Sequence, residues 1–169
     1  MLAPLPMNRP LAVEDLADRL PVKARLIGID LGTKTIGLAL SDVERRLASP
    51  LKTLARTTFR KDADSLLGVF REFEIAAVVL GLPLDLEGRT TPRAQSTRAF
   101  ARNLATRTDL PIAYWDERFS TAVVLRSLIE NDVSRAKRAE VIDKMAASYI
   151  LQGALDRLSA LAADRGKSG

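Results

Sequence analysis

The sequence predicts an α/β domain whose five-stranded mixed sheet begins with a three-strand antiparallel meander, continues with parallel strands, and carries helices on both faces. Two apolar segments joined by a tight turn at residues 31–34 are typical of a hairpin. The aliphatic run Ile75–Leu80, bounded by Gly81 and Pro83, is typical of a parallel strand that is buried on both faces. After this run, helical and extended patterns alternate, which indicates crossover connections between parallel strands.

The elements are expected in the following order. Residues 1–22 contain four prolines and are interpreted as an N-terminal extension, with at most a short helix at 13–20, before a domain at 23–163. We expect strands at 25–30, 35–40, 47–54, 75–80 and 110–115, and helices at 61–73, 91–106, 120–130 and 139–161. Thr91 and Pro92 provide an N-cap and a first-turn proline for the helix at 91–106. Residues 164–169 are expected to form a flexible tail.

The composition restricts the chemistry available to this chain. Its 169 residues include no cysteine and no histidine, which excludes disulfides, thiolate zinc sites and histidine-dependent catalytic triads. Catalysis would then depend on carboxylates, which are hard oxygen ligands suited to Mg²⁺ or Mn²⁺. A chain without thiols also suits the reducing cytosol, so a cytoplasmic location is expected.

The charge balance favours a polyanionic partner. The chain has 26 Lys and Arg against 21 Asp and Glu, a formal net charge of +5, and a pI of about 9.9. Such a balance favours nucleic acid, although many basic proteins bind none. The apolar runs are too short to span a bilayer and the N-terminal residues lack a signal-peptide pattern, so no membrane association is expected.

Three carboxylates are candidates for a catalytic site. Asp30 ends the first strand of the hairpin, Glu117 follows the strand at 110–115, and Asp143 lies on the last helix among small residues. The carboxyl ends of parallel strands meet at one edge of the sheet, where the crevice of such a fold lies. Taken singly, each acid also fits a structural role: accepting hydrogen bonds from turn amides, complementing a helix dipole, or pairing with a neighbouring base.

The three acids together indicate a metal site. Neighbours in an extended segment point oppositely, so only one of Asp116 and Glu117 is expected to enter the site, while the other caps the next helix or pairs with Arg118. Two like charges about 4 Å apart repel by roughly 4 kcal/mol at an effective dielectric of 20, so clustered carboxylates need divalent cations to remain ionised. Two metals about 4 Å apart would activate water and stabilise the leaving oxygen of a phosphodiester.

Four blocks of sequence carry a resemblance to a known family. They are residues 28–42 with Gly-Ile-Asp-Leu-Gly-Thr, Val79–Leu84 with Gly88, residues 116–121, and Asp143 with Ala146 and Ala147. In this order they resemble the YqgF-like proteins, described as Holliday-junction resolvases and as nucleases that process the 5′ end of 16S ribosomal RNA precursor. The resemblance spans Leu26 to Leu155 and implies an RNase H-like fold, Mg²⁺- or Mn²⁺-dependent nuclease activity, and a catalytic, metal-binding trio of Asp30, Glu117 and Asp143.

Basic side chains around the crevice are expected to contact the substrate. The predicted phosphate ligands are Lys34, Arg89, Arg93 and Arg118. Arg98 and Arg102 are one helical turn apart and fit either a phosphate contact or a solvated helix face. Trp115 and Phe119 fit core packing better than stacking on a base.

Several functions fit this pattern. The expected partner is an RNA precursor, with ribosome association, or branched DNA, and the chain is either a monomer or a homodimer. A non-catalytic RNA-binding assembly factor is a second class. A third is an actin- or Hsp70-like ATP-binding domain, because Gly-Ile-Asp-Leu-Gly-Thr also resembles the first phosphate loop of those proteins. Such ATPases need two related domains, however, and Leu161 stands where a Walker loop ending at Gly166-Lys167-Ser168 requires glycine.

Overall fold

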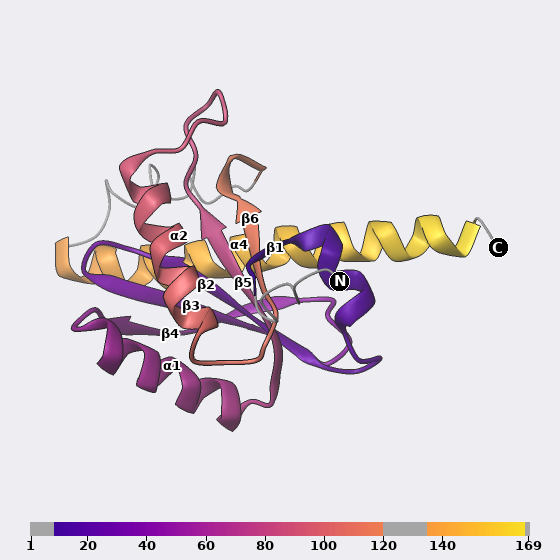
Figure 1. The fold of residues 1–169 in the computed structure, drawn as a ribbon, viewed down its shortest axis with the longest axis horizontal. Helices are drawn as coiled ribbons and strands as arrows, with labels where there is room; N and C mark the ends of the chain where they lie inside the picture. The colour runs from indigo at the N-terminus through magenta and orange to yellow at the C-terminus, as the bar shows by residue number, and fades with distance from the viewer. Residues whose placement is uncertain (1–8, 120–134, 168–169) are drawn as a thin grey trace, which may run out of the picture.

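The computed structural model describes residues 9–119 and 135–167, without the side chains of 119 and 135–143. Its centre is a mixed sheet of β1 (Leu11–Ala12), β2 (Arg25–Leu31), β3 (Thr35–Ser41), β4 (Ala48–Ala55), β5 (Ile75–Leu82) and β6 (Ile112–Asp116). The strand order is β1-β6-β5-β2-β3-β4 (Figure 1). The α/β class predicted from the sequence is confirmed, and the helix expected at 120–130 lies outside the described residues.

The pairing of the strands follows the predicted topology. β2, β3 and β4 form an antiparallel meander, in which Asp30 of β2 lies opposite Gly37 of β3. β5 and β6 run parallel to β2, with Ile29 paired to Leu80 on β5 and Gly81 paired to Trp115 on β6. The carboxyl ends of β2, β5 and β6 therefore meet at one edge of the sheet, where the crevice of a parallel sheet is expected.

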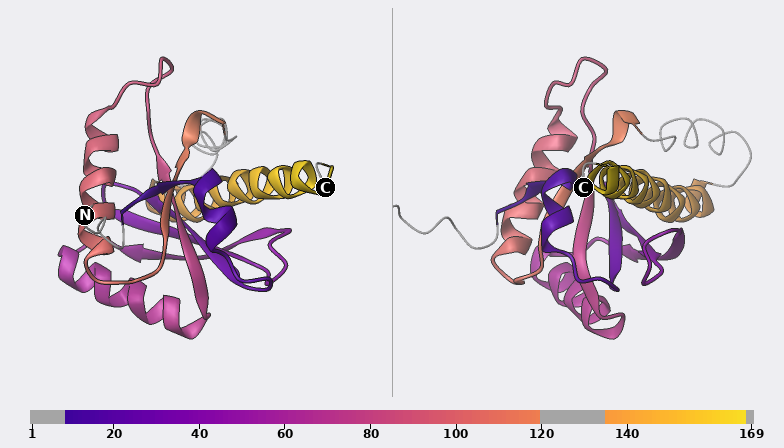
Figure 2. Two further views of the ribbon diagram at one scale, coloured as in Figure 1. Left: turned by 45° about the vertical axis from the view of Figure 1, so that its right-hand side comes forward. Right: turned by 90° about the vertical axis from the view of Figure 1, so that its right-hand side faces the viewer.

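Helices cover both faces of this sheet, as predicted. They are α1 (Phe59–Glu72), α2 (Pro92–Ala105) and α4 (Arg135–Lys167), with the short 3-10 helices η1 (Val13–Arg19) and η2 (Glu117–Phe119). Figure 2 shows α1 and α2 on one side of the strands and α4 on the other. The predicted cap of α2 is confirmed, because the hydroxyl oxygen of Thr91 accepts a hydrogen bond from the Ala94 N–H at 3.1 Å and Pro92 opens the helix.

The sheet has six strands rather than the predicted five, and the additional strand comes from residues expected to form an extension. β1 pairs parallel to β6, with Leu11 opposite Ala113. Val13 and Leu16 of η1 are then buried in the core that α4 covers. A strand of two residues is too short to produce a period-two pattern, which is why the sequence does not reveal it.

The last helix is longer than predicted at both ends. α4 begins at Arg135 and continues through Lys167, so it includes most of the segment expected to be a tail. Arg165 in its last turn contacts Asp18 of η1, with 2.7 Å between Nη1 and Oδ1. No helix in the described part of the chain is long and apolar enough to cross a membrane.

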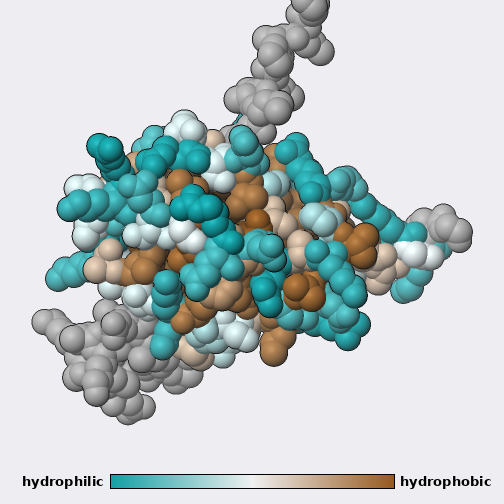
Figure 3. All heavy atoms as spheres, turned by 90° about the horizontal axis from the view of Figure 1, so that it is seen from below, coloured by the Kyte–Doolittle hydropathy of each residue, from teal (hydrophilic) through white to brown (hydrophobic). Residues whose placement is uncertain are grey.

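Two cores lie on opposite faces of the sheet. Ile27, Ile29 and Leu31 of β2 pack with α1 and α2, whereas Leu26 of β2 packs with α4. On the outside, hydrophilic side chains cover much of the face seen in Figure 3, with apolar ones exposed in patches between them. The alternation along β2 places its even-numbered residues, Asp30 included, on the α4 face.

Candidate active site

Asp30 is a buried carboxylate near the carboxyl end of β2. Its side chain is fully buried, with 0% of its surface exposed. Gly28, two residues earlier on the same face, lies directly under α4: a Cβ atom there would be 2.8 Å from the Ala147 carbonyl oxygen. Burying an ionised carboxylate is costly unless a cation or several donors compensate it. An ionised Asp30 carboxylate therefore requires a cation or hydrogen-bond donors at this position.

Glu117 reaches the same region from a different strand. It is the first residue of η2, directly after β6, and is 3% exposed. Its Oε1 atom lies only 2.7 Å from the position that a Cβ atom at Gly81 would occupy. Because Ile29 pairs with Leu80, Gly81 is the β5 neighbour of Asp30, and adjacent strands are about 4.8 Å apart. The Glu117 carboxylate thus lies over the strand next to Asp30.

Gly81 makes this approach possible, and sequence reasoning did not identify it as a site residue. A Cβ atom at position 81 would also collide with the Ile150 side chain of α4. A glycine near the end of an otherwise aliphatic strand is the available signal, because such a glycine often marks close approach of another group. The glycine leaves room for both the Glu117 carboxylate and α4.

Asp143 belongs to α4, and its side chain lies outside the described residues. Its backbone is one helical turn before Ala147, the residue that touches Gly28 of β2. Among the residues whose side chains are described, no group of three or more Asp or Glu forms a metal site. The structure therefore brings Asp30 and Glu117 to one edge, and the binding of metal by Asp30, Glu117 and Asp143 stays a prediction.

Asp116 and Glu117 take different directions, as expected for neighbours at a strand end. Asp116 pairs with Arg118, with 2.6 Å between Oδ2 and Nη2, and its Oδ1 accepts a hydrogen bond from the Arg118 N–H at 3.0 Å. This pairing with Asp116 raises the pKa of the Arg118 guanidinium above its usual value. Arg118 also donates to the Leu86 carbonyl oxygen at 3.3 Å, which links η2 to the loop after β5.

The four predicted phosphate ligands have different surroundings. Lys34 is exposed in the turn after Asp30, and exposed Arg93 donates from Nη2 to the Leu31 carbonyl oxygen at 3.2 Å, so both lie at the end of β2. Arg89 instead pairs with Asp85 and Glu87 of its own loop, and Arg118 pairs with Asp116. The N–H of Arg89 is the main cause that lowers the pKa of Asp85.

One cation near Asp30 was missed by sequence reasoning. Arg56, just after β4, donates from Nη1 to the Gly32 carbonyl oxygen at 2.7 Å, and its N–H donates to the Lys34 carbonyl oxygen at 2.8 Å. Trp115 follows the packing interpretation: a Cβ atom at Gly153 of α4 would lie 2.7 Å from its ring. The side chain of Phe119 lies outside the described residues.

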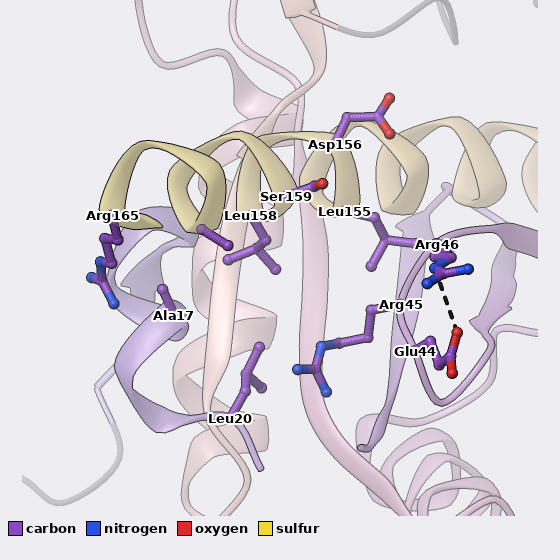
Figure 4. Close-up of a pocket in the computed structure, with 11 residues that line it drawn as sticks. Ala17, Leu20, Glu44, Arg45, Arg46, Leu155, Asp156, Leu158, Ser159 and Arg165 are labelled. Atoms are coloured by element: carbon purple, nitrogen blue, oxygen red, sulfur yellow. Dashed lines mark ion pairs between the residues drawn. The ribbon is translucent and has the colours of Figure 1, made fainter. Parts of the chain in front are cut away.

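A cavity of about 660 Å³ lies at the opposite edge of the sheet (Figure 4). Residues of η1, the β3–β4 turn and the last turns of α4 line it. None of the predicted site residues does. The cations around it are already engaged. Arg46 pairs with Glu44, Arg165 pairs with Asp18, and Arg45 donates to the Ala24 carbonyl oxygen.

Comparison with known proteins identifies the family. Residues 24–157 match the family model described as RuvX, Holliday junction resolvase. The chain belongs to the RuvX family. A relative from Methylocella silvestris is 60% identical over 154 residues, covering 91% of this chain and 96% of the relative. A second, from Beijerinckia indica, is 59% identical over 149 residues, covering 88% of this chain and 90% of the relative. Both relatives carry the name "Putative pre-16S rRNA nuclease".

A solved structure supports the fold assigned to this RuvX family member. The T. thermophilus RuvC structure, in complex with a Holliday junction substrate, aligns with a TM-score of 0.50 at 14% sequence identity. The alignment covers 82% of this chain and 96% of RuvC. At this low identity the likeness shows the fold alone, and that fold is the RNase H-like one predicted from the sequence.

Proposed function

We propose that this RuvX family member is a metal-dependent nuclease that hydrolyses phosphodiester bonds, and that its substrate is the 5′ region of 16S rRNA precursor. The observation that carries the proposal is the pair of buried carboxylates, Asp30 and Glu117, which arrive from β2 and β6 at one edge of the sheet. The shared name of the relatives at about 60% identity favours precursor RNA.

The residues at this edge fit a hard divalent cation. Asp30 and Glu117 supply carboxylate oxygens, the donors that Mg²⁺ and Mn²⁺ prefer, and both side chains are buried at this edge of the sheet. In the proposal, Asp143 completes the ligand set from α4. A bound Mg²⁺ or Mn²⁺ would supply activation of water and stabilisation of the leaving oxygen.

The chain's own cations have separate roles in this proposal. Lys34 and Arg93, exposed at the end of β2, bind the phosphates that flank the scissile bond. Arg118, held by Asp116, fixes the loop after β5 against η2 and so positions Glu117. Arg89 is already paired with two acids of its loop, so we assign it a smaller part in substrate binding than Lys34.

A four-way DNA junction is the second candidate substrate. The family model is described as a Holliday junction resolvase, and the fold matches RuvC. A resolvase that cuts two strands symmetrically is expected to act as a dimer, whereas an enzyme that trims RNA ends has no such requirement.

The test uses three substitutions and one matched control. Asp30→Asn, Glu117→Gln and Asp143→Asn each remove one ligand charge, so cleavage of labelled precursor RNA in Mn²⁺ should fall to the level seen with EDTA. Asp156→Asn changes an exposed acid on the same helix as Asp143 and should leave cleavage unchanged. Running precursor RNA and a four-way junction side by side identifies the substrate. Full activity in all three ligand variants would overturn the nuclease assignment.

A further inference from the structure

A cavity of about 380 Å³ lies beside the candidate active site. Its wall includes Leu82 and Asp116, the last residues of β5 and β6, so it opens at the same edge of the sheet as Glu117. Leu11 of the edge strand β1 closes another side. The volume falls within the range of about 300–1,000 Å³ that small-molecule sites occupy.

The wall of the cavity is partly apolar and includes two aromatic side chains. Tyr114 and Trp115 of β6 line it, and both are only partly buried. The Arg98 guanidinium of α2, which also lines the cavity, lies over the Tyr114 ring at 5.3 Å from its centroid. Aromatic rings and guanidinium planes are the surfaces on which unpaired nucleobases stack. Burial raises the pKa of the Tyr114 hydroxyl, which therefore stays protonated at neutral pH and can donate a hydrogen bond.

The charge around the cavity favours an anion. α2 contains three arginines, Arg93, Arg98 and Arg102, and no acidic residue. Within residues 9–118 and 144–167, none of these arginines forms an ion pair. The two acids that line the cavity are already paired, Asp116 with Arg118 at 2.6 Å and Glu14 with Arg157 at 3.2 Å. The larger cavity at the other edge differs, because its arginines are engaged by acids and carbonyls.

We infer that this cavity is a nucleotide subsite, in which one unpaired base of the substrate strand stacks beside Tyr114 and Arg98 while its phosphate contacts the Arg98 guanidinium. The inference rests on the proposed nuclease function and narrows its substrate class. A base that is stacked and paired in a duplex cannot enter a cavity of this size, so the strand must be single-stranded there. The subsite favours an RNA end over an intact duplex arm.

Binding can be measured without cleavage, in EDTA, on the full-length protein. Trp115 is the chain's only tryptophan and lines the cavity, so its fluorescence reports occupancy. The probes are a short single-stranded oligoribonucleotide, a fully abasic strand of the same length, and a duplex of the same sequence. We expect the oligoribonucleotide to change the fluorescence and to bind about ten-fold more tightly than the abasic strand, and the duplex to leave the fluorescence unchanged.

Two pairs of variants assign the effect to the cavity. Tyr114→Ala should abolish the preference for the strand with bases, and Tyr114→Phe should keep it. Arg98→Ala should weaken the binding of both strands and lower the slope of log affinity against log salt by about 0.7, the value for one phosphate contact on a single strand. Arg71→Ala removes an exposed cation on α1 and should leave affinity and slope unchanged.

The inference is overturned if wild-type protein binds both strands equally, if its fluorescence does not respond, or if Arg98→Ala behaves like Arg71→Ala. Failure of the nuclease proposal would look different. Precursor RNA would remain uncut in Mn²⁺ while the oligoribonucleotide still bound better than the abasic strand in EDTA. A wild-type protein that cleaves precursor RNA in Mn²⁺ but shows no preference for the strand with bases would overturn the subsite alone.

Discussion

At the scale of single residues, three glycines set how closely other groups approach the α4 face of the sheet. Gly28 admits the backbone of α4, Gly81 admits the Glu117 carboxylate and Ile150, and Gly153 of the helix admits the Trp115 ring. Gly81 has the most direct link to the candidate site, because the group it admits is one of the two buried carboxylates.

Replacing Gly81 by alanine should therefore disturb both packing and the site. The new Cβ would lie 2.7 Å from Glu117 Oε1 and would collide with Ile150. Over-packing of this kind typically costs about 1–3 kcal/mol, so the free energy of unfolding should fall by that amount in urea titrations. Displacement of the Glu117 carboxylate should also weaken Mn²⁺ binding, which calorimetric titration measures.

Gly68→Ala is the matched control. Gly68 lies inside α1, and a Cβ atom there would have nothing within 4 Å. Alanine is preferred to glycine in a helix interior, so this variant should gain about 0.5–1 kcal/mol of stability and bind Mn²⁺ like the wild type. An unchanged Mn²⁺ affinity in Gly81→Ala would show that Glu117 is not a ligand or that the strand shifts to accommodate the methyl group without moving it.

The sequence predicted the position of residues that stand out from their local pattern, whereas their role in catalysis stays a prediction. Asp30 interrupts an apolar strand, and Glu117 follows one, so both were predicted at the edge where the structure places them. It did not anticipate that Arg89 would pair within its own loop, because competition between acids for one guanidinium depends on the three-dimensional path of the loop. The contact of Arg56 with the Gly32 carbonyl oxygen was missed because it joins residues that are 24 positions apart in the chain.

At the scale of elements, the long periodic segments were predictable and the short ones were not. The meander, the buried strand β5 and the capped helix α2 each have many residues that repeat one pattern. β1 and η1 together span residues 11–19, and their burial depends on pairing with β6 and packing on α4. Contacts between segments so distant in the chain leave no periodic signal in either one.

The N-terminal segment should make a measurable contribution to stability. Leu16 is fully buried between η1 and α4, so Leu16→Ala removes apolar contacts and leaves a cavity. Core substitutions of this type cost about 2–5 kcal/mol. Leu47→Ala, at a position that is 63% exposed, should change stability by no more than about 0.5 kcal/mol. Equal unfolding midpoints for the two variants would indicate that residues 11–19 do not pack on the domain in solution.

At the scale of the whole molecule, the two edges of the sheet differ in how their charges are compensated. At the amino edge of β2, the arginines that surround the larger cavity are neutralised by Glu44 and Asp18 or bound to carbonyl oxygens. At the carboxyl edge lie two buried carboxylates and the exposed Arg93 of α2, which contacts the end of β2 and has no ion pair within the described side chains. This edge is thus suited to a cation and a polyanion together, which is the combination that a nuclease complex requires.

Divalent metal should therefore stabilise the folded protein as a whole. A ligand that binds the folded state alone stabilises it by RT ln(1 + [L]/Kd), about 2.7 kcal/mol at a hundred times Kd. For a chain of 169 residues this corresponds to a rise of about 5–11 °C in Tm, measurable by thermal unfolding in Mg²⁺ against EDTA. Asp30→Asn removes the charge of one proposed metal ligand, so this variant should lose the rise in Mg²⁺. Asp156→Asn should keep the rise, because its carboxylate is exposed on the outer surface of α4. A wild-type Tm that is the same in Mg²⁺ and in EDTA would contradict a metal site at Asp30 and Glu117.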